Sequence, residues 1–143
     1  MRILVTTLML LVVAGAAAAQ TTADEIVAVL EGTAEGWNAG DLQRYMQGYW
    51  RSEDLRFASG GTVTYGWEAT LERYRARYPD KAAMGTLRFS DVDVELLGDD
   101  TACVFGAWEL QRAEDRPHGL FTLVFRRLPE GWRIVHDHTS AAD

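Results

Sequence analysis

The sequence predicts an α+β domain in which helices precede the main strands. Apolar residues recur at helical spacing between residues 26 and 37 and again between residues 67 and 78. From residue 87 onward, apolar runs and apolar–polar alternation are instead separated by turns that contain glycine, proline or aspartate. Helices and strands segregated along a chain in this way are typical of the α+β class.

The overall composition limits the size of the domain and its partners. The chain has 143 residues and a formal charge of -7, which predicts one domain with an acidic surface. Because binding to phosphate backbones requires a basic surface, nucleic acid is not an expected partner. A single cysteine, Cys103, excludes an internal disulfide.

The N-terminal segment resembles a signal peptide in its layout. Arg2 supplies a positive charge, residues 3–13 are mostly apolar, and a run of small residues ends at Ala19. The apolar run is short for a membrane-spanning helix. We therefore predict a signal peptide over 1–19 and a mature domain over 20–143, which is periplasmic or secreted and makes no membrane contact after cleavage.

Three helices are expected before the long strands. The capping-box pattern Thr22–Glu25 predicts the start of the first helix, and Gly40 predicts its end. A short second helix is expected over 42–48. The pair Gly60-Gly61 predicts a tight hairpin, and a third helix is expected over 67–78.

Four long antiparallel strands are expected after the third helix. The alternation changes phase between Phe89 and Val92, which predicts a β-bulge. Residues 101–111 and 120–128 are apolar on both faces, so these strands are expected to be central and covered on both sides. Residues 131–140 form the closing strand.

The closing strand contains His136-Asp137-His138. Because strand side chains alternate, His136 and His138 are expected on one face with Trp132 and Ile134, and Asp137 on the other. No metal site is expected, since the chain has no further cluster of residues with metal-ligand spacing. Local hydrogen bonds or a sheet interface would equally explain the histidines.

Asp137 is the main candidate for chemistry. A carboxyl group on an apolar face has a raised pKa through lost hydration, unless a cation pairs with it. Arg56, Arg126 and Arg133 are candidate partners. A free and a paired carboxylate therefore both stay open.

Aromatic residues are concentrated in the first two expected helices. Trp37, Tyr45 and Tyr49 are each explained by core filling, but as a group they favour a cavity with an aromatic wall. Gly106 beside Trp108 on one strand face leaves room above the sheet, which also suits a cavity. A tryptophan that fills this room is the alternative.

Four stretches, together with the order of elements, resemble the nuclear-transport-factor-2-like superfamily, which includes SnoaL-like polyketide cyclases and ketosteroid isomerases. These stretches are Asn38–Leu42, Tyr65–Ala69, Gly98–Ala102 and Gly131–Ser140. The last is also similar to the closing strand of the association domain of calcium/calmodulin-dependent protein kinase II. The resemblance implies a cystatin-like fold, in which a cone-shaped, strongly curved, antiparallel or mixed sheet wraps around three N-terminal helices. It also implies a SnoaL-like domain over 20–143 and a pocket at the open end.

The resemblance further implies roles for individual residues. It places Asp137 inside the pocket as a general base and Tyr45 as a hydrogen-bond donor to a developing enolate. Together with the aromatic helices and the rim, the expected ligand-contacting residues are Trp37, Tyr45, Tyr49, Trp67, Tyr74, Trp108, Thr122, Asp137 and His138. The expected homodimer interface on the outer sheet face consists of Trp132, Ile134 and His136.

The sequence supports three hypotheses about function. The leading hypothesis is an exported small-molecule-binding protein with an aromatic-lined pocket and no cofactor. The second is an isomerase or cyclase that uses Asp137 as general base. The third is a homodimeric association module without a ligand. Whether the protein is an enzyme at all is left open by the sequence.

Overall fold

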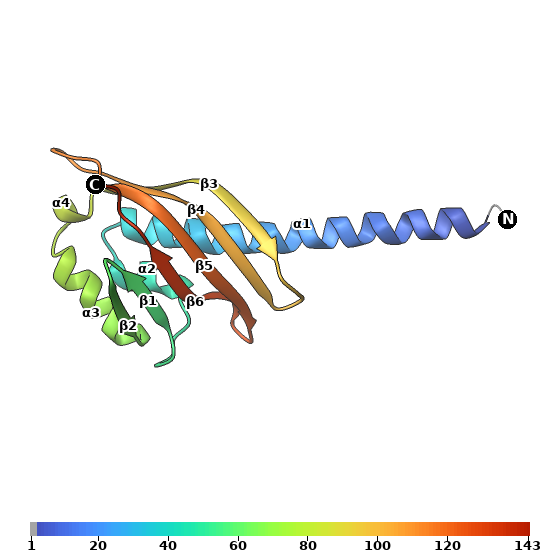
Figure 1. Cartoon of the computed structure of the whole chain (residues 1–143), viewed down its shortest axis with the longest axis horizontal. Helices are drawn as coiled ribbons and strands as arrows, with labels where there is room; N and C mark the ends of the chain where they lie inside the picture. Colours follow the sequence, from blue (N-terminus) through green and yellow to red (C-terminus); the bar gives the residue numbers. More distant parts are fainter. Residues whose placement is uncertain (1–2) are drawn as a thin grey trace.

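A curled sheet wraps around a set of helices (Figure 1). The computed structural model describes residues 3–143, with side chains from residue 13 onward. The helical elements are α1 (Ile3–Asn38), α2 (Leu42–Tyr45), the 3-10 turn η1 (Met46–Gly48), α3 (Trp67–Arg77) and α4 (Lys81–Met84). The strands are β1 (Arg56–Ser59), β2 (Thr62–Tyr65), β3 (Thr86–Leu96), β4 (Thr101–Gln111), β5 (His118–Leu128) and β6 (Gly131–Thr139).

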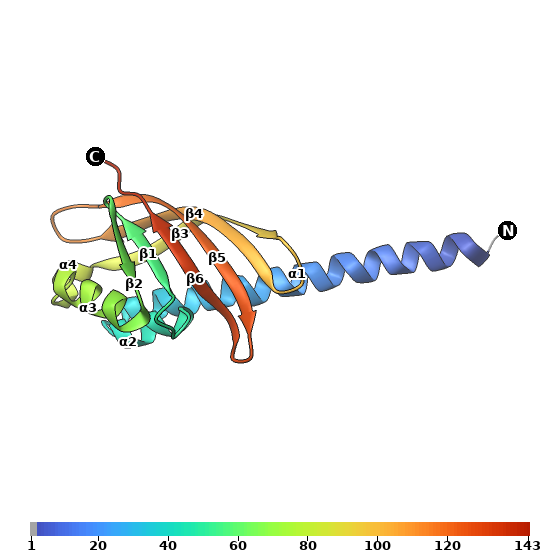
Figure 2. The same ribbon diagram turned by 60° about the horizontal axis from the view of Figure 1, so that its bottom comes forward.

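The strands form one mixed sheet in the order β2-β1-β6-β5-β4-β3. Neighbouring strands are antiparallel except β1 and β6, which run parallel. The sheet curls over α1, and α2 and α3 lie on the same side of it (Figures 1 and 2). The predicted α+β, cystatin-like architecture with a strongly curved mixed sheet is therefore confirmed.

The first helix is longer than predicted. It runs without a break from Ile3 to Asn38, so Thr22 does not start it, because the alanine-rich segment before Thr22 is itself a good helix former. Its N-terminal part projects away from the sheet (Figure 1). Ile26 is the first buried residue among the described side chains. In the part of the chain from residue 3 on, no helix is both long enough and apolar enough to span a membrane.

A short helix that was not predicted, α4, follows Pro79. The Asp80 carboxylate accepts a 2.8 Å hydrogen bond from the backbone N–H of Ala83 and so caps α4. The indole N–H of Trp37 donates to the carbonyl oxygen of Met84 at 3.1 Å. This bond ties the C-terminal turn of α1 to the segment that leads into β3.

The predicted bulge in β3 is confirmed. The pairing with β4 shifts register between Ser90 and Asp93, and Asp91 has a positive φ of 52°. The extra residue keeps Phe89 and Val94 on the same, inward face of the sheet, opposite Trp108 and Val104 respectively.

A second bulge, in β6, changes the predicted faces of the closing strand. The register steps from Phe125–Ile134 to Val124–His136, so one extra β6 residue lies between the two pairs. Trp132 and Ile134, at 3% and 1% exposure, therefore point into the core. They are not on the outer face with His136, because the bulge reverses the alternation between them. The interface prediction is wrong for Trp132 and Ile134.

The outer face of the sheet is open in the described part of the chain. The helices pack on the concave face alone (Figure 2), so β4 and β5 are not covered on both sides as predicted. Phe105 and Leu120 are 46% and 50% exposed on these neighbouring strands. Their double apolar pattern therefore reflects one buried and one exposed apolar face.

Candidate functional site

A cavity of about 780 Å³ lies between the concave face of the sheet and the helices. Its volume is within the usual range for small-molecule sites. The wall is largely aromatic, and the aromatic residues that line it are Trp37, Tyr45, Tyr49, Phe57, Tyr74, Tyr78, Phe89, Trp108 and Phe121. Asp137 and Thr139 add polar groups from β6.

The β6 bulge brings Asp137 into this cavity. Asp137 pairs with Leu123 of β5 on one side and with Phe57 of β1 on the other, so its side chain lies between two apolar neighbours. It is 3% exposed. No ion pair joins it to Arg56, Arg126, Arg133 or any other cation of the described residues. The carboxyl group is therefore not paired.

Two hydroxyl groups hold the Asp137 carboxylate. Tyr49 donates to one oxygen at 2.8 Å, and Thr139 donates to the other at 2.8 Å. Thr139 is two residues along the same strand, so it shares the inward face with Asp137. Hydrogen bonds to a charged acceptor each stabilise a fold by about 1.5–3 kcal/mol. These bonds offset part of the cost of burying the carboxylate.

Backbone contacts place the two tyrosines that lie closest to Asp137. Tyr49 forms a parallel bridge with Ile134, beside the β6 bulge. Tyr45 is held near α1 because Gly36 has no side chain, and a Cβ atom there would lie 2.5 Å from the backbone nitrogen of Tyr45. Tyr45 and Tyr49 lie on either side of the 3-10 turn η1, and both side chains line the cavity.

The tyrosine hydroxyls form a chain that ends at Asp137. The Tyr45 oxygen lies 3.0 Å from the Tyr49 oxygen and 3.1 Å from the Tyr74 oxygen. Each hydroxyl has one proton, and Tyr49 gives its proton to the Asp137 carboxylate. Tyr45 therefore donates to Tyr49, and Tyr74 donates to Tyr45. The Tyr45 proton is thus engaged inside the chain, not directed at a ligand.

Burial controls the titration of this cluster. Burial raises the pKa of Asp137 to about 6, against the lowering effect of its hydrogen bonds from Tyr49 and Thr139 and of the charge on His138. Burial, and then the negative charge of Asp137, raises the pKa of the Tyr49 phenol well above its ordinary value. Near neutral pH the phenols are therefore protonated donors, and Asp137 is an ionised base close to its titration point.

Six of the predicted ligand-contacting residues line the cavity. They are Trp37, Tyr45, Tyr49, Tyr74, Trp108 and Asp137. Gly106 provides no free space, however, because the Phe121 ring packs against it, and a Cβ atom at Gly106 would lie 2.5 Å from that ring.

Three predicted residues lie elsewhere. Trp67 is buried beside η1, where its indole N–H donates to the Met46 carbonyl oxygen at 2.8 Å. Thr122 and His138 are cross-strand partners on the outer sheet face, because Phe121 and Leu123 occupy the inward positions of β5. They therefore contribute no cavity wall, and His138 is not at the rim.

Sequence reasoning missed several residues of the cavity. The position of Thr139 in the cavity could have been predicted, because a side chain two positions from Asp137 in a strand shares its face. Phe57 and Arg73 were not, because their place depends on the parallel pairing of β1 with β6 and on the packing of α3. No group of three or more potential metal ligands occurs in the part of the chain that the structure describes.

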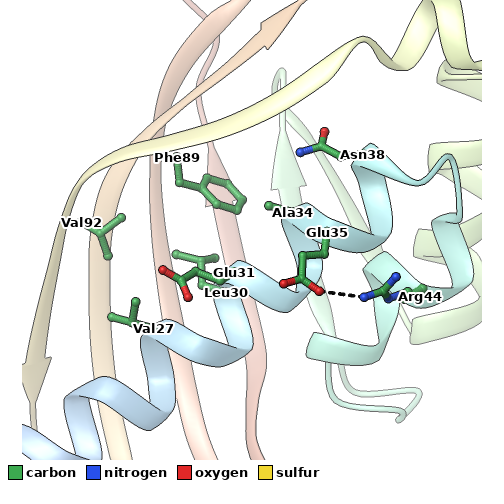
Figure 3. Close-up of a pocket in the computed structure, with 9 residues that line it drawn as sticks. All are labelled: Val27, Leu30, Glu31, Ala34, Glu35, Asn38, Arg44, Phe89 and Val92. Atoms are coloured by element: carbon green, nitrogen blue, oxygen red, sulfur yellow. Dashed lines mark hydrogen bonds and ion pairs between the residues drawn. The ribbon is translucent and has the colours of Figure 1, made fainter.

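A second hollow of about 580 Å³ lies between α1 and β3 (Figure 3). At its side Arg44 and Glu35 form an ion pair at 2.7 Å, and both side chains are largely exposed. Exposed pairs of this kind contribute little to stability. Leu30 and Phe89 line both hollows. Since the buried carboxyl and the hydroxyl chain belong to the larger cavity, that cavity is the candidate site.

The comparisons with known proteins agree with this geometry. The family model described as "SnoaL-like domain" matches residues 26–143. No functionally curated protein matches the chain. An NTF-2-like protein of unknown function from Shewanella oneidensis has a TM-score of 0.79 and 43% identity over 82% of this chain and 98% of its own.

More distant structures show the fold alone. An NTF2-like superfamily protein from Salmonella enterica has a TM-score of 0.71 and 21% identity, over 87% of this chain and 94% of its own. A ketosteroid isomerase-like protein from Erwinia carotovora has a TM-score of 0.67 and 17% identity, over 84% of this chain and 95% of its own. From its curled sheet, its cavity and the match over residues 26–143, this chain belongs to the SnoaL-like domain family and has the nuclear-transport-factor-2-like fold.

Proposed function

We propose that this chain is a small-molecule-binding protein whose ligand occupies the cavity above Asp137. The observation that carries the proposal is a cavity of about 780 Å³ that combines an aromatic wall with one buried, unpaired carboxyl group. Apolar walls with a few convergent polar groups are characteristic of ligand sites. An association module without a ligand would instead be expected to fill this space with side chains.

The lining defines the shape and chemistry of the ligand. The rings of Trp37 and Trp108 favour a flat or apolar body, since aromatic faces stack well against such groups. The Asp137 oxygens favour a hydroxyl or amine donor at the deep end when the carboxyl group is ionised. A compound with an apolar body and one polar group at that end therefore fits best.

Tryptophan fluorescence tests ligand binding directly. Compounds released from the purified protein and identified by mass spectrometry would be added back to ligand-free protein. We expect the fluorescence change to shrink in Trp108→Phe, since Trp108 lines the cavity. Trp67→Phe is the matched control, because Trp67 lies outside it. An equal change in both variants would place the ligand elsewhere and contradict the proposal.

A second function, proton transfer next to a carbonyl group, is favoured by the titration of Asp137. A general base is most effective when its pKa is near the working pH, and burial raises the pKa of Asp137 to about 6. Asp137 would take the proton, and its bond from Tyr49 would weaken as the carboxylate loses its charge. Tyr45 would act through the hydroxyl chain and not as a direct donor to the ligand, because its hydroxyl already donates a hydrogen bond to the Tyr49 oxygen.

Hydrogen–deuterium exchange tests this second function without a known substrate. In heavy water, a bound cyclic ketone would exchange the acidic hydrogens on the carbon next to its carbonyl group for deuterium. NMR measures the rate of this exchange. We expect Asp137→Asn to slow protein-dependent exchange by about 10²–10⁴-fold. Thr122→Ala, on the outer sheet face, is the control. Equal rates in wild type and Asp137→Asn would rule out Asp137 as the base.

We also propose that residues 1–19 are a signal peptide that is removed on export to the periplasm or outside the cell. Two observations support this. The described side chains from residue 13 to residue 20 are exposed, and the family match begins only at residue 26. Removal of this segment therefore takes away no buried side chain among those that the structure describes.

We further propose that two copies associate through the outer face of the sheet. Phe105 and Leu120 expose apolar surface on adjacent strands of this face, and His136 lies on the same side. Burial of such surface is the main favourable term in association. The core residues Trp132 and Ile134 take no part in this proposal.

A further inference from the structure

The charge of the cavity lining differs from that of the whole protein. The chain has 14 basic and 21 acidic residues. Of the described residues that line the cavity, however, the basic ones are Arg73, Arg77 and Arg112, and Asp137 is the only acidic one. In a chain that is acidic overall, the charged side chains that line the cavity are thus mainly cations.

The positive charge of Arg112 is balanced by a carboxylate outside the cavity lining. Its guanidinium forms two parallel hydrogen bonds to the Asp115 carboxylate, at 2.6 and 2.7 Å. It also donates to the carbonyl oxygen of Ala83 at 3.1 Å. Bidentate pairs of this kind are the most specific that arginine forms. Arg112 therefore has a structural role in the loop after β4 and is not free for a ligand.

Arg73 makes several contacts, but none of them is with an anionic group that would balance its positive charge. Its guanidinium donates to the carbonyl oxygen of Ser59 at 3.0 Å and to the hydroxyl of Thr64 at 2.9 Å. It also lies over the Phe57 ring, with 4.7 Å between the guanidinium carbon and the ring centroid. All of these partners are uncharged. The guanidinium is thus held in place at the β1–β2 hairpin without compensation of its positive charge.

Arg77 lies one helical turn after Arg73 on α3. Residues four apart face the same side of a helix, so both arginines lie along one edge of the cavity. Arg77 is exposed, and no ion pair of the described residues includes it. Asp137, by contrast, is almost fully buried. The cavity therefore runs from a buried carboxyl group to an edge with two cations.

From this arrangement we infer that the natural ligand is an amphipathic anion, whose carboxylate, sulfonate or phosphate group binds Arg73 and Arg77 while its apolar body lies against the aromatic wall. The inference rests on the proposed binding function and adds the chemical class of the ligand. Guanidinium groups bind oxyanions through charge-assisted hydrogen bonds. The orientation follows, because an anionic group at the deep end would meet the Asp137 carboxylate.

Two dyes with the same aromatic skeleton test the inference. Anilinonaphthalene sulfonate has an anionic group, and phenylnaphthylamine is the same skeleton without it. Both become fluorescent in apolar surroundings, so their affinities can be measured by titration of the full protein. We expect added salt to weaken binding of the sulfonate and to leave the neutral dye nearly unchanged, because salt screens exposed charges.

Variants along α3 locate the effect. We expect Arg77→Gln to weaken the sulfonate dye by about three- to tenfold, and Arg73→Gln by about tenfold, with the neutral dye unchanged. Arg75→Gln is the matched control, because it removes the same charge from the same helix at a position outside the cavity. Arg73→Lys keeps a charge and should restore part of the affinity. A melting curve for Arg73→Gln checks the hairpin contacts.

Blocking the cavity separates this inference from the binding function itself. Ala76 lines the cavity and is exposed, so Ala76→Trp should fill the mouth and weaken both dyes. If Ala76→Trp weakens both dyes and the arginine variants affect neither, small-molecule binding stands and the anion inference is wrong. If Arg75→Gln weakens the sulfonate dye as much as Arg77→Gln does, the affinity depends on the net charge of the protein and not on the cavity, and the inference also fails. If neither dye responds to Ala76→Trp, both proposals are contradicted.

Discussion

The hydroxyl group of Tyr49 donates a 2.8 Å hydrogen bond to the buried carboxylate of Asp137, which lies 88 positions later in the chain. This bond joins the end of the early helices to the closing strand. It also links Asp137 to Tyr45 and Tyr74 through their hydroxyls. The candidate site is therefore a single hydrogen-bonded unit whose parts come from distant segments.

Loss of this bond is expected to change the titration of Asp137. In Tyr49→Phe the pKa of Asp137 should rise further above about 6, because a hydrogen bond to the charged form lowers it. The free energy of unfolding at neutral pH should fall by about 1–3 kcal/mol. Carbon NMR of the carboxyl group and chemical denaturation measure the two effects. Tyr65→Phe is the control, since Tyr65 is 60% exposed. An unchanged Asp137 titration would contradict the bond.

Asp137 is expected to make stability depend on pH. Its folded pKa of about 6 exceeds the ordinary value of 3.8, so its contribution is fully present below pH 3.8 and is lost as pH rises through 6. The shift corresponds to about 3 kcal/mol. The Asp137→Asn variant should therefore lack this loss between pH 4 and 7. Chemical denaturation at pH 4 and at pH 7 measures the free energy of unfolding of wild type and of Asp137→Asn. If this free energy changes equally with pH in the two proteins, the raised pKa of Asp137 is contradicted.

Trp132 is expected to stabilise the core and not an interface. In Trp132→Ala the free energy of unfolding should fall by about 3–5 kcal/mol, because a buried indole leaves a large cavity. His138→Ala, six residues along the same strand but on the exposed face, should change it by about 0.5 kcal/mol or less. Urea denaturation compares the two variants. A small effect of Trp132→Ala would mean that the β6 bulge does not turn this residue inward.

Phe105 tests association through the sheet. If two copies pair through the outer face, Phe105→Asp should convert a dimer into a monomer, because a buried unpaired charge is strongly unfavourable. Light scattering after size-exclusion chromatography measures the mass. Val63→Asp is the control, since Val63 is similarly exposed but lies on β2, at the edge of the sheet. A dimer that persists in Phe105→Asp contradicts this interface.

Removal of residues 1–19 is expected to leave the domain intact. A protein that starts at Gln20 should melt within about 1–2 °C of the full chain, because the first described buried side chain is that of Ile26. Circular dichroism measures the transition. Mass spectrometry of the protein recovered from a secreting host shows whether Gln20 is the new N-terminus. An intact Met1 in that sample would contradict cleavage.

Much of the fold follows from local pattern. The helical spacing of Ile26, Leu30 and Trp37 predicts the part of α1 that packs in the core, and the phase change after Phe89 predicts the β3 bulge. Such patterns act over a few residues, since side-chain direction repeats every 3.6 residues in a helix and every two in a strand. The start of α1 was misplaced because a cap at Thr22 competes with a helical segment before it.

The closing strand shows where local pattern stops. The sequence by itself placed Asp137 on the other face of the strand from His136 and His138, which is correct. Only the pairing of β6 with β5 decided that Trp132, Ile134 and Asp137 all face inward, because a bulge is set by the register with the neighbouring strand. The hydroxyl chain and the two uncompensated arginines likewise depend on contacts between distant segments. Residue spacing determines the face of each element, and tertiary packing determines which faces meet.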